Sequence, residues 1–331
     1  MKKCDRIAIA IGDPNGIGPE LAIKAAASFI GSDLQAVIVG DAFVIQEYAR
    51  RHASGSALRT LAQTGDDADI ENEIVYFPVE ALASAAFNPG QVDPAAGRAT
   101  VAYVREAVRL AQAGKVKAIV GCPHSETAIN SAGIPFSGYP QLIAQLTGTP
   151  ENKVFLMLAA AGLRIAHVTL HESVQHALNR MTVDLVVEAG VAAIQACQRL
   201  GLENVTLGVF GINPHAGENG LFGDEDERIT RPAVQRLRAL GIAADGPVGA
   251  DLLLGQRRHD VYLAMFHDQG HIPIKLLSPL RASALTIGAD ILFSSVGHGS
   301  AFDIAGRGIA DPVAVIETVA LLHAAKNREI Q

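Results

Sequence analysis

Short apolar runs alternate along this chain with longer segments in which apolar residues recur every three or four positions. The runs are typical of buried strands, and the longer spacing is typical of helices that bury one face. The expected strands are residues 6–11, 35–40, 73–79, 116–120, 154–159, 163–169, 205–211, 261–266, 283–288 and 291–296. The expected helices are residues 19–27, 43–51, 93–114, 141–146, 184–200, 229–240 and 313–326. This alternation predicts an α/β fold, with a mixed sheet because some strands are joined by short turns.

The segments between these elements are expected to be connections. Residues 53–69 are small and polar, and residues 212–223 and 246–250 have the composition of loops. Residues 12–20 form a glycine-rich turn that leads into the first helix. This turn either cradles an anion or serves only close packing, because its glycine spacing differs from the P-loop and dinucleotide fingerprints.

Three apolar runs lead into a histidine: His171, His215 and His267. Each could be a structural hydrogen-bonding residue. Three such placements together favour a shared metal, since imidazole suits zinc and its neighbours and three protein ligands with an open position form a catalytic site. The residues alone therefore leave two alternatives open, a shared divalent metal held by these three histidines and three separate structural histidines.

A metal of this kind has two uses that the ligand types do not separate. In the first use, the metal acts as a Lewis acid while a substrate alcohol loses a hydride and an adjacent carboxylate leaves as carbon dioxide. In the second use, it ionises water for hydrolysis. Because no side chain accepts a hydride, the first use also needs a nicotinamide carrier.

Other polar residues have supporting roles open to them. Asp251 and Asp268 are expected to orient ligand imidazoles. Lys275 is placed to meet a substrate carboxylate or to serve as acid or base, with a surface lysine as the alternative. His167 and His271 are expected to be structural. Cys122 is expected to be a buried thiol rather than a nucleophile.

Composition narrows the class of protein. The 331 residues carry a formal net charge of −7, spread without a basic cluster, which argues against nucleic acid and anionic membrane as partners. No segment has the length of a membrane span or the pattern of a signal peptide, and three distant cysteines suggest no disulfide framework. We expect a soluble cytoplasmic protein.

Several long motifs resemble one known family over nearly the whole chain. The stretches GDPNGIGPE, AINSAGIPFSG, INPHAGE, DQGHIPIK and HGSAFDIAGRGIAD are similar to those of the 4-hydroxythreonine-4-phosphate dehydrogenases. The resemblance implies an isocitrate/isopropylmalate dehydrogenase-like fold of two three-layer α/β/α domains with a cleft between them. The first domain would be residues 1–132 with 300–331, and the second, residues 133–299, would carry the metal ligands and the dimer interface.

The same resemblance implies a homodimer whose sites use both subunits. The metal would be zinc, or iron, cobalt or nickel, held by His171, His215 and His267, with one of the three from the partner chain. The carrier would be NAD. It would lie along residues placed by resemblance alone: Gly288, Gly299, Ser300 and Asp303.

The substrate positions depart from the phosphothreonine pattern. Tyr139-Pro140 replaces a His-Thr pair, Ala284 an Asn, Phe293 an Arg and Gly297 an Asp, and Glu126 stands where the family has a lysine. Each lost recognition group costs a phosphate ligand on the order of 1–3 kcal/mol. The pocket is therefore expected to take a flatter, less anionic ligand.

A subfamily with this pattern is the terephthalate dihydrodiol dehydrogenases, matched by CPHSETAI, FSGYP, LRIAHVTLHESV and SSVGHGSA. It implies oxidative decarboxylation of the cis-dihydrodiol of terephthalate, a dicarboxylate diol, to protocatechuate. The expected catalytic residues are Lys275 and Asp251. The expected substrate-binding residues are Ser125, Tyr139, Lys275 and Phe293. The alternatives are a dehydrogenase of 4-hydroxythreonine-4-phosphate or a related phosphorylated hydroxy acid, and a metal-loaded binding protein that has lost catalysis.

Overall fold

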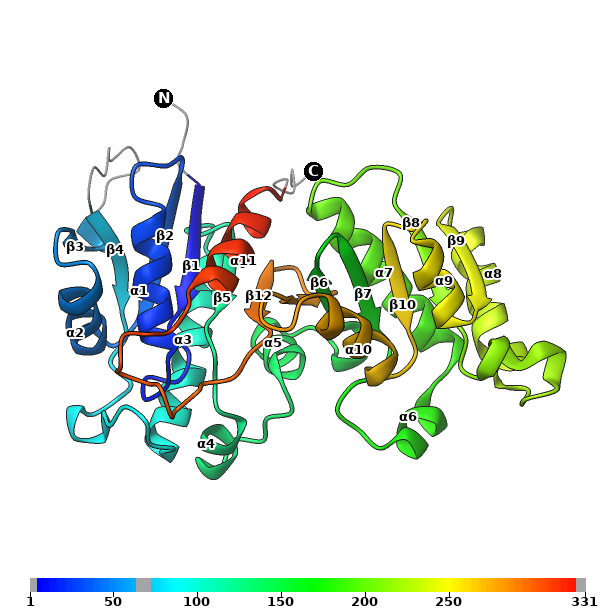
Figure 1. Cartoon of the computed structure of the whole chain (residues 1–331), viewed down its shortest axis with the longest axis horizontal. Helices are drawn as coiled ribbons and strands as arrows, with labels where there is room; N and C mark the ends of the chain where they lie inside the picture. The colour runs from blue at the N-terminus through cyan, green and yellow to red at the C-terminus, as the bar shows by residue number, and fades with distance from the viewer. Residues whose placement is uncertain (1–4, 64–72, 326–331) are drawn as a thin grey trace. The chain divides into compact units, whose positions relative to one another are not determined.

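Six parallel strands form the sheet of the first of two compact units (Figure 1). The computed structural model describes residues 5–63 and 73–325, and this unit comprises Met1–Tyr139 and Ile291–His323. Its described strands, in spatial order, are β3 (Ala57–Thr60), β4 (Glu73–Pro78), β2 (Leu34–Gly40), β1 (Asp5–Ala10), β5 (Ala118–Gly121) and β12 (Phe293–Val296). Every pairing among them is parallel.

Helices cover this sheet on both faces. Their bounds are α1 (Gly18–Ser28), α2 (Ala42–His52), α3 (Pro94–Gln112), α4 (Glu126–Ser131) and α11 (Val313–His323), with short 3-10 turns at Leu61–Gln63 and Ser84–Ala86. The crossovers β1–α1–β2 and β4–α3–β5 run in opposite directions along the sheet. Right-handed crossovers then place α1 and α3 on opposite faces. Strands β1, β2, β5 and β12 are largely buried on both sides, which explains their continuous apolar runs.

The second unit, Pro140–Asp290 with Ala324–Gln331, contains a mixed sheet. Its described strands, in spatial order, are β11 (Ser283–Ile287), β6 (Phe155–Ala160), β7 (Leu163–His167), β10 (Val261–Ala264), β8 (Thr206–Phe210) and β9 (Ala243–Val248). The pairs β11/β6 and β6/β7 are antiparallel, and the others are parallel. The expected hairpin of β6 and β7 is confirmed.

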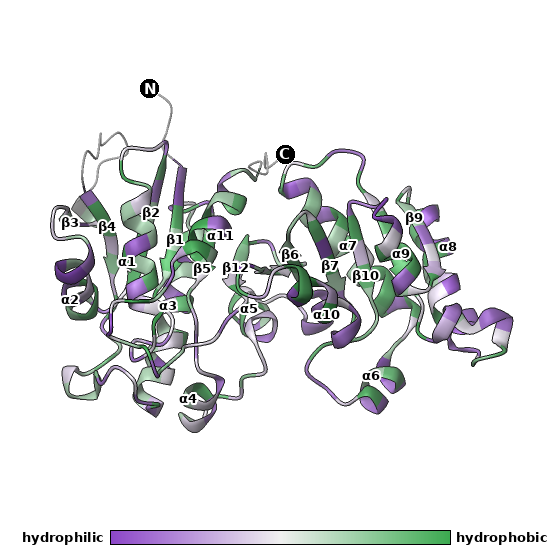
Figure 2. Ribbon diagram, in the orientation of Figure 1, coloured by the Kyte–Doolittle hydropathy of each residue, from purple (hydrophilic) through white to green (hydrophobic). Residues whose placement is uncertain are grey.

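The helices of the second unit are α5, which begins in the first unit (Tyr139–Thr147), α6 (Val174–Arg180), α7 (Val183–Arg199), α8 (Arg231–Ala239), α9 (Ala250–Gln256) and α10 (His267–Leu277), with shorter turns at Glu151–Lys153, Pro214–Gly220 and Asp226–Thr230. Of these helices, α7 to α10 contact this sheet. Helix α10 lies against β6, β7 and β10. In Figure 2, α11 and β12 are mostly apolar, whereas α2 and α8 carry polar surfaces.

Side-chain caps mark where several helices begin. Asp93 accepts a hydrogen bond from the backbone N–H of Ala95 at 2.6 Å at the start of α3, and Thr182 accepts one from Leu185 at 3.2 Å at the start of α7. Such caps satisfy N–H groups that the first turn leaves unpaired. The sequence predicted both of these helices within two residues of their observed bounds.

Several expectations about connections were wrong. The connection predicted at 53–69 contains β3, and its residues 64–69 lie outside the described residues, as does Lys326 at the predicted end of α11. The loop predicted at 246–250 contains the end of β9 and the start of α9. Helices α4, α6 and α10 were also missed. They are short, or in α10 interrupted by Pro273, so their apolar spacing is weak. No helix within the described ranges is both long and apolar enough to cross a membrane.

Close packing of α10 on β7 depends on Gly270. A Cβ atom at this position would lie 2.2 Å from His167 Nε2 and 2.9 Å from Ile165 Cγ2. We expect Gly270→Ala to lower the free energy of unfolding by about 1–3 kcal/mol, because the added methyl overpacks a filled contact. Urea unfolding followed by circular dichroism measures this change.

Gly255→Ala in α9 is the matched control, since no atom lies within 4 Å of the position of its added Cβ. This variant should be as stable as the wild type or gain up to about 1 kcal/mol. Equal effects of the two substitutions would contradict the packing assigned to Gly270.

Candidate active site

Four histidines of the second unit form a row, here called the histidine row. In order they are His171, His267, His271 and His167. Successive ring centroids are 5.5, 3.7 and 4.7 Å apart. The fold produces this spacing, because His267 and His271 are one turn apart on α10 and His167 ends β7, on which α10 packs.

Gln269 fixes the start of α10. Its Oε1 accepts hydrogen bonds from the backbone N–H groups of Met265 at 2.9 Å and Phe266 at 3.1 Å. Its Nε2 donates to the carbonyl of Gly211 at 2.9 Å. One side chain therefore ties the end of β10 to the loop after β8. The backbone N–H groups of the two residues before His267, which is the first residue of α10, therefore have hydrogen-bond partners.

The inner half of the row is uncharged. Burial lowers the pKa of His167 to about 3, and the neighbouring His271 lowers it further. Burial also lowers the pKa of His271 to about 4, with repulsion from His267 as the second cause. The hydrogen bonds assign the tautomers: His167 Nδ1 donates to the Leu156 carbonyl at 3.2 Å, so His167 Nε2 accepts from His271 Nδ1 at 3.1 Å. His271 Nε2 then keeps its lone pair.

The outer half of the row presents donors of the kind a metal needs. His267 Nδ1 lies 2.7 Å from Asp268 Oδ1, which leaves His267 Nε2 to face a ligand. A carboxylate in this position fixes the ring orientation of a ligand imidazole and raises its basicity. Asp268 is one of the two residues, with Asp251, for which this role was predicted. His171, whose ring neighbours that of His267, is exposed.

His215 lies elsewhere, in the loop after β8. Residues His215 to Asn219 all have positive φ, between 45° and 82°. This costs free energy at the non-glycine positions. Asp226, fully buried, holds the loop by accepting from the N–H groups of Ile212 and Asn213 at 2.8 and 2.9 Å. The His215 side chain is 74% exposed, with Glu218 3.6 Å away.

These donors fit a divalent metal only in part. Among residues 5–63 and 73–325, no three His, Cys, Asp or Glu side chains are arranged to hold a metal. The row supplies two neighbouring imidazoles of the right chemistry, His171 and His267. A complete site therefore needs at least one ligand that this arrangement of a single chain does not bring to them.

The two residues predicted to be catalytic lie on different helices. Lys275 is half-buried in the last turn of α10, two turns from His267, and burial lowers its pKa. Asp251 is exposed in the first turn of α9. Lys275 thus shares the helix of the histidine row, and Asp251 does not.

In the first unit, a polar side chain with a buried atom follows each of three parallel strands at its carboxyl end. Asp13 follows β1, His124 follows β5 and Ser300 follows β12. We call these three residues the strand-end set. Among the described residues, Asp13 Oδ2, His124 Nε2 and Ser300 Oγ are buried without a hydrogen-bond partner. Ligands of open parallel sheets bind at this edge.

Backbone contacts hold the three loops of this set together. The N–H of Asp13 donates to the Pro123 carbonyl at 2.9 Å, and the N–H of Ile17 donates to the Ser300 carbonyl at 3.0 Å. A Cβ atom at Gly16 would lie only 2.9 Å from Ser300 Cβ, so the turn needs glycine to approach this closely. The glycine-rich turn therefore serves close packing, and it also carries Asp13.

Burial sets the charge state of the strand-end set. It raises the pKa of Asp13 to about 6, although Oδ1 accepts the N–H of Asn15 at 2.9 Å, which opposes the rise. It lowers the pKa of His124 to about 4. At neutral pH, Asp13 is therefore an ionised carboxylate whose burial costs free energy, and His124 is an uncharged imidazole.

An aromatic cluster adjoins His124. The Tyr139 ring lies 4.4 Å from that of His124, 4.8 Å from that of Phe293 and 5.9 Å from that of Phe136. Tyr139 and Phe293, both predicted to bind substrate, are almost fully buried. Ser125, predicted with them, caps α4 by accepting the N–H of Ala128 at 3.1 Å.

The residues assigned to the nicotinamide carrier lie in two units. Ser300 is buried, whereas Gly299 and Asp303 are exposed after β12. Gly288 belongs to the second unit, where its φ of +94° ends β11 and a Cβ would collide with the Lys153 carbonyl. Of these residues, Ser300 is the one that presents an unsatisfied buried atom, and it fits a group that brings a hydrogen bond.

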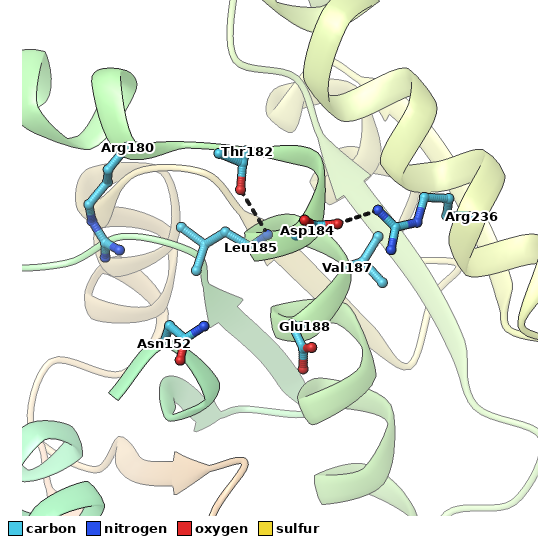
Figure 3. Close-up of a pocket in the computed structure, with 8 residues that line it drawn as sticks. All are labelled: Asn152, Arg180, Thr182, Asp184, Leu185, Val187, Glu188 and Arg236. Atoms are coloured by element: carbon cyan, nitrogen blue, oxygen red, sulfur yellow. Dashed lines mark hydrogen bonds and ion pairs between the residues drawn. The ribbon is translucent and has the colours of Figure 1, made fainter. Parts of the chain in front are cut away.

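A cavity of about 480 Å³ in the second unit lies apart from the histidine row (Figure 3). It surrounds the start of α7, where Asp184 pairs with Arg236 and Thr182 caps the helix. Arg180 is also paired, with Glu172 at 2.8 Å. Two arginines and two acidic residues line the cavity, so their formal charges cancel. None of the predicted site residues lines it.

Asp13 and His124 were not predicted as site residues from the sequence. Both stand in motifs that carry the family resemblance, but neither has a metal-ligand or nucleophile pattern around it. Their place directly after apolar runs is the signal that was available, the same signal that drew attention to His171, His215 and His267.

The raised pKa of Asp13 makes stability depend on pH. Below about pH 4 this carboxyl is protonated in the folded and the unfolded chain, and above about pH 6 it is ionised in both. The free-energy cost of burying the charge therefore appears as the pH rises from about 4 to about 6. Asp13→Asn removes the cost. We expect the stability of the variant relative to the wild type to rise by about 3 kcal/mol between pH 4 and pH 8. Urea unfolding across this range measures the difference.

Ser300→Ala serves as the control for that experiment, because serine does not titrate in this range. Its stability relative to the wild type should stay constant with pH. A constant difference for Asp13→Asn as well would contradict the raised pKa.

Comparison with known proteins identifies relatives of this chain. Residues 32–322 match the family described as pyridoxal phosphate biosynthetic protein PdxA. A relative from Comamonas sp., 1,2-dihydroxy-3,5-cyclohexadiene-1,4-dicarboxylate dehydrogenase, is 51% identical over 319 residues, which are 96% of this chain and 97% of the relative.

Two solved structures are similar over almost their full length. A terephthalate 1,2-cis-dihydrodiol dehydrogenase from Burkholderia xenovorans is 48% identical, with a TM-score of 0.73 over 97% of this chain and 98% of the other. A 4-hydroxythreonine-4-phosphate dehydrogenase from Klebsiella pneumoniae is 32% identical, with a TM-score of 0.84 over 98% and 99%. These likenesses confirm the resemblance read from the motifs, and the chain belongs to the PdxA family of dehydrogenases.

Proposed function

We propose that this protein oxidises and decarboxylates the cis-dihydrodiol of terephthalate to protocatechuate, with NAD as the hydride acceptor. The observation that carries the proposal is the 51% identity with the Comamonas dihydrodiol dehydrogenase over 96% of the chain. The substituted substrate positions support it. Phe293 and Ala284 stand where the phosphothreonine pattern has an arginine and an asparagine, so a phosphate would lack its partners.

The aromatic cluster suits the proposed substrate. Tyr139, Phe293 and Phe136 give the carboxyl end of β5 an apolar border, and Gly121 on β5 is in contact range of the first two rings. A flat carbon ring loses little on entering such surroundings, whereas a phosphate would lose its hydration without compensation. The fold is proposed to follow the two-domain arrangement of the isocitrate and isopropylmalate dehydrogenases.

The proposed metal site uses His171, His215 and His267, one of them from a second chain, with zinc, iron, cobalt or nickel as the ion. When bound, the ion would stabilise negative charge on the substrate oxygens as a Lewis acid. Asp268 holds the ring of His267, and Gln269 holds the turn on which His267 sits. Both keep the donor atom in place before substrate arrives.

The chain must also move a proton and hold a carboxylate. The reaction removes a hydroxyl proton and a hydride from the alcohol carbon and then releases carbon dioxide, which makes the ring aromatic. Burial lowers the pKa of Lys275, so it gives up its proton more readily than an exposed lysine and can take the hydroxyl proton. Its charged form can instead meet a ring carboxylate. Asp251 is the other candidate base. NAD, when bound near Gly288, Gly299, Ser300 and Asp303, would accept the hydride.

An apolar stripe supports the proposed homodimer. Ile272 and Leu276 on α10, and Leu280 beyond its end, are spaced four residues apart and are 54%, 79% and 68% exposed. A contiguous apolar surface of this kind is typical of protein interfaces. It lies on the helix that carries His267, and a chain that gathers two of three imidazoles fits a site completed by a second copy. Sedimentation should give twice the 34.7 kDa of one chain, and a monomer would contradict the dimer.

The second candidate function is oxidation of 4-hydroxythreonine-4-phosphate. The TM-score of 0.84 with the Klebsiella enzyme favours it. The two candidates differ in one property, the need for cationic and amide partners for a phosphate.

Turnover separates the candidates. With NAD and a divalent metal, the terephthalate diol should yield NADH, carbon dioxide and protocatechuate in equal amounts, measured by absorbance at the nicotinamide band and by chromatography. The 4-phosphohydroxythreonine should react at least about 100-fold more slowly, since two or more lost recognition groups each cost on the order of 1–3 kcal/mol. NADH formation from the phosphate ester alone would reject the proposal.

Metal content tests the ligands independently of turnover. After dialysis against zinc-free buffer, the wild type should retain metal, and His171→Ala, His215→Ala and His267→Ala should each bind zinc at least about 100-fold more weakly, because each removes one of three donors. Metal analysis and a competitive chelator titration measure this.

His176→Ala is the matched control, because His176 is an exposed histidine of the same unit that pairs with Glu172 at 2.8 Å. It should bind zinc as the wild type does. Full affinity in any of the three ligand variants would remove that residue from the site.

A further inference from the structure

The strand-end set is a group of unsatisfied polar atoms at the edge where ligands of parallel sheets bind. Asp13 Oδ2, His124 Nε2 and Ser300 Oγ lie on loops that backbone hydrogen bonds join directly. Buried polar atoms in native proteins are nearly always paired, so three on neighbouring loops indicate a partner that the chain itself does not supply.

The chemistry of the three atoms restricts that partner. Asp13 is 0% exposed and offers a carboxylate oxygen, which accepts hydrogen bonds. Ser300 can donate or accept, and so can one nitrogen of an uncharged imidazole. A phosphate or carboxylate would be repelled by Asp13. An uncharged hydroxyl-bearing group has the chemistry to donate to Asp13 and to exchange hydrogen bonds with the other two.

We propose that Asp13, His124 and Ser300 bind the hydroxyl groups of a ligand, with Asp13 as the acceptor. Two ligands of the proposed reaction have this chemistry: the ribose of the nicotinamide carrier and the diol of the ring substrate. The inference rests on the proposed function only for this choice of ligands. The aromatic rings of Tyr139 and Phe136 beside His124 give either ligand an apolar surface next to its hydroxyls.

The presence of an ionisable group at this buried position supports a role in binding. Asparagine would keep the bond that Asp13 Oδ1 accepts from Asn15 and would carry no charge into the interior. A donor from the ligand would offset the cost of that charge, because a hydrogen bond to an ionised group is stronger than one to a neutral group.

The test is equilibrium binding, which does not require turnover. NADH affinity is measured by its fluorescence, and affinity for protocatechuate, the proposed product that keeps two adjacent hydroxyls, by calorimetry. Asp13→Asn should raise the dissociation constant of one or both probes roughly 10- to 100-fold, because an amide nitrogen cannot accept. Ser300→Ala and His124→Phe should raise it roughly 2- to 10-fold, since each removes a neutral hydrogen bond.

Asp41→Asn is the matched control. Asp41 is a buried carboxylate of the same unit, but its oxygens accept from the Ala81 and Leu82 N–H groups at 3.1 Å and from the Tyr103 hydroxyl at 2.5 Å. Its affinities should stay within about twofold of the wild type. Ser300→Ala removes an atom without a partner, so it should fold normally and keeps the test valid if an aspartate variant unfolds.

The outcomes distinguish the two ligands. Weaker binding of NADH alone places the ribose at the strand-end set, and weaker binding of protocatechuate alone places the ring hydroxyls there. Unchanged affinities for both probes in Asp13→Asn and Ser300→Ala, or a wild type that binds neither probe, would overturn the inference. Failure of the proposed function would look different, as a wild type that binds NADH but does not oxidise the diol.

Discussion

The contact between α10 and β7 is the constraint on which the candidate metal site depends. Gly270 lets the helix approach until His271 Nδ1 can donate to His167 Nε2, and Gln269 fixes where the helix begins. The rings of His267 and His271 stack with their centroids 3.7 Å apart. A site whose donor atoms are fixed before the ligand binds does not spend binding energy on ordering them.

The two units supply different kinds of chemistry. In the second unit, burial and mutual repulsion keep His167 and His271 neutral, so lone pairs persist at neutral pH. In the first unit, burial raises the pKa of Asp13 to about 6. This carboxyl still ionises at neutral pH, but its ionisation costs free energy. The same physical cause, desolvation, thus keeps two imidazoles uncharged in one unit and makes an ionised carboxylate costly in the other.

The sequence predicted much of the fold because its buried parallel strands are continuous apolar runs, as in β1, β2 and β8. It failed where apolar spacing does not decide the structure. Helix α10 contains Gly270, His271 and Pro273, residues that read as a loop, and it is helical because it packs on β7 and β10. Strand β9 contains Gly246 and Pro247 and lies at the end of the sheet, where proline is tolerated.

The sequence pointed to some residues of the candidate sites and not to others. His171 and His267 were found because a histidine after an apolar run stands out, and the fold brings their rings to 5.5 Å. Asp13 stands after β1 in the same way, yet an aspartate in a glycine-rich turn is common as a turn residue. What distinguishes it is burial together with an oxygen that nothing in its surroundings satisfies, and those properties arise only when Pro123, Ser300 and Asn15 close around it. A local pattern can suggest a candidate metal ligand, whereas an unsatisfied buried atom can be recognised only in the assembled fold.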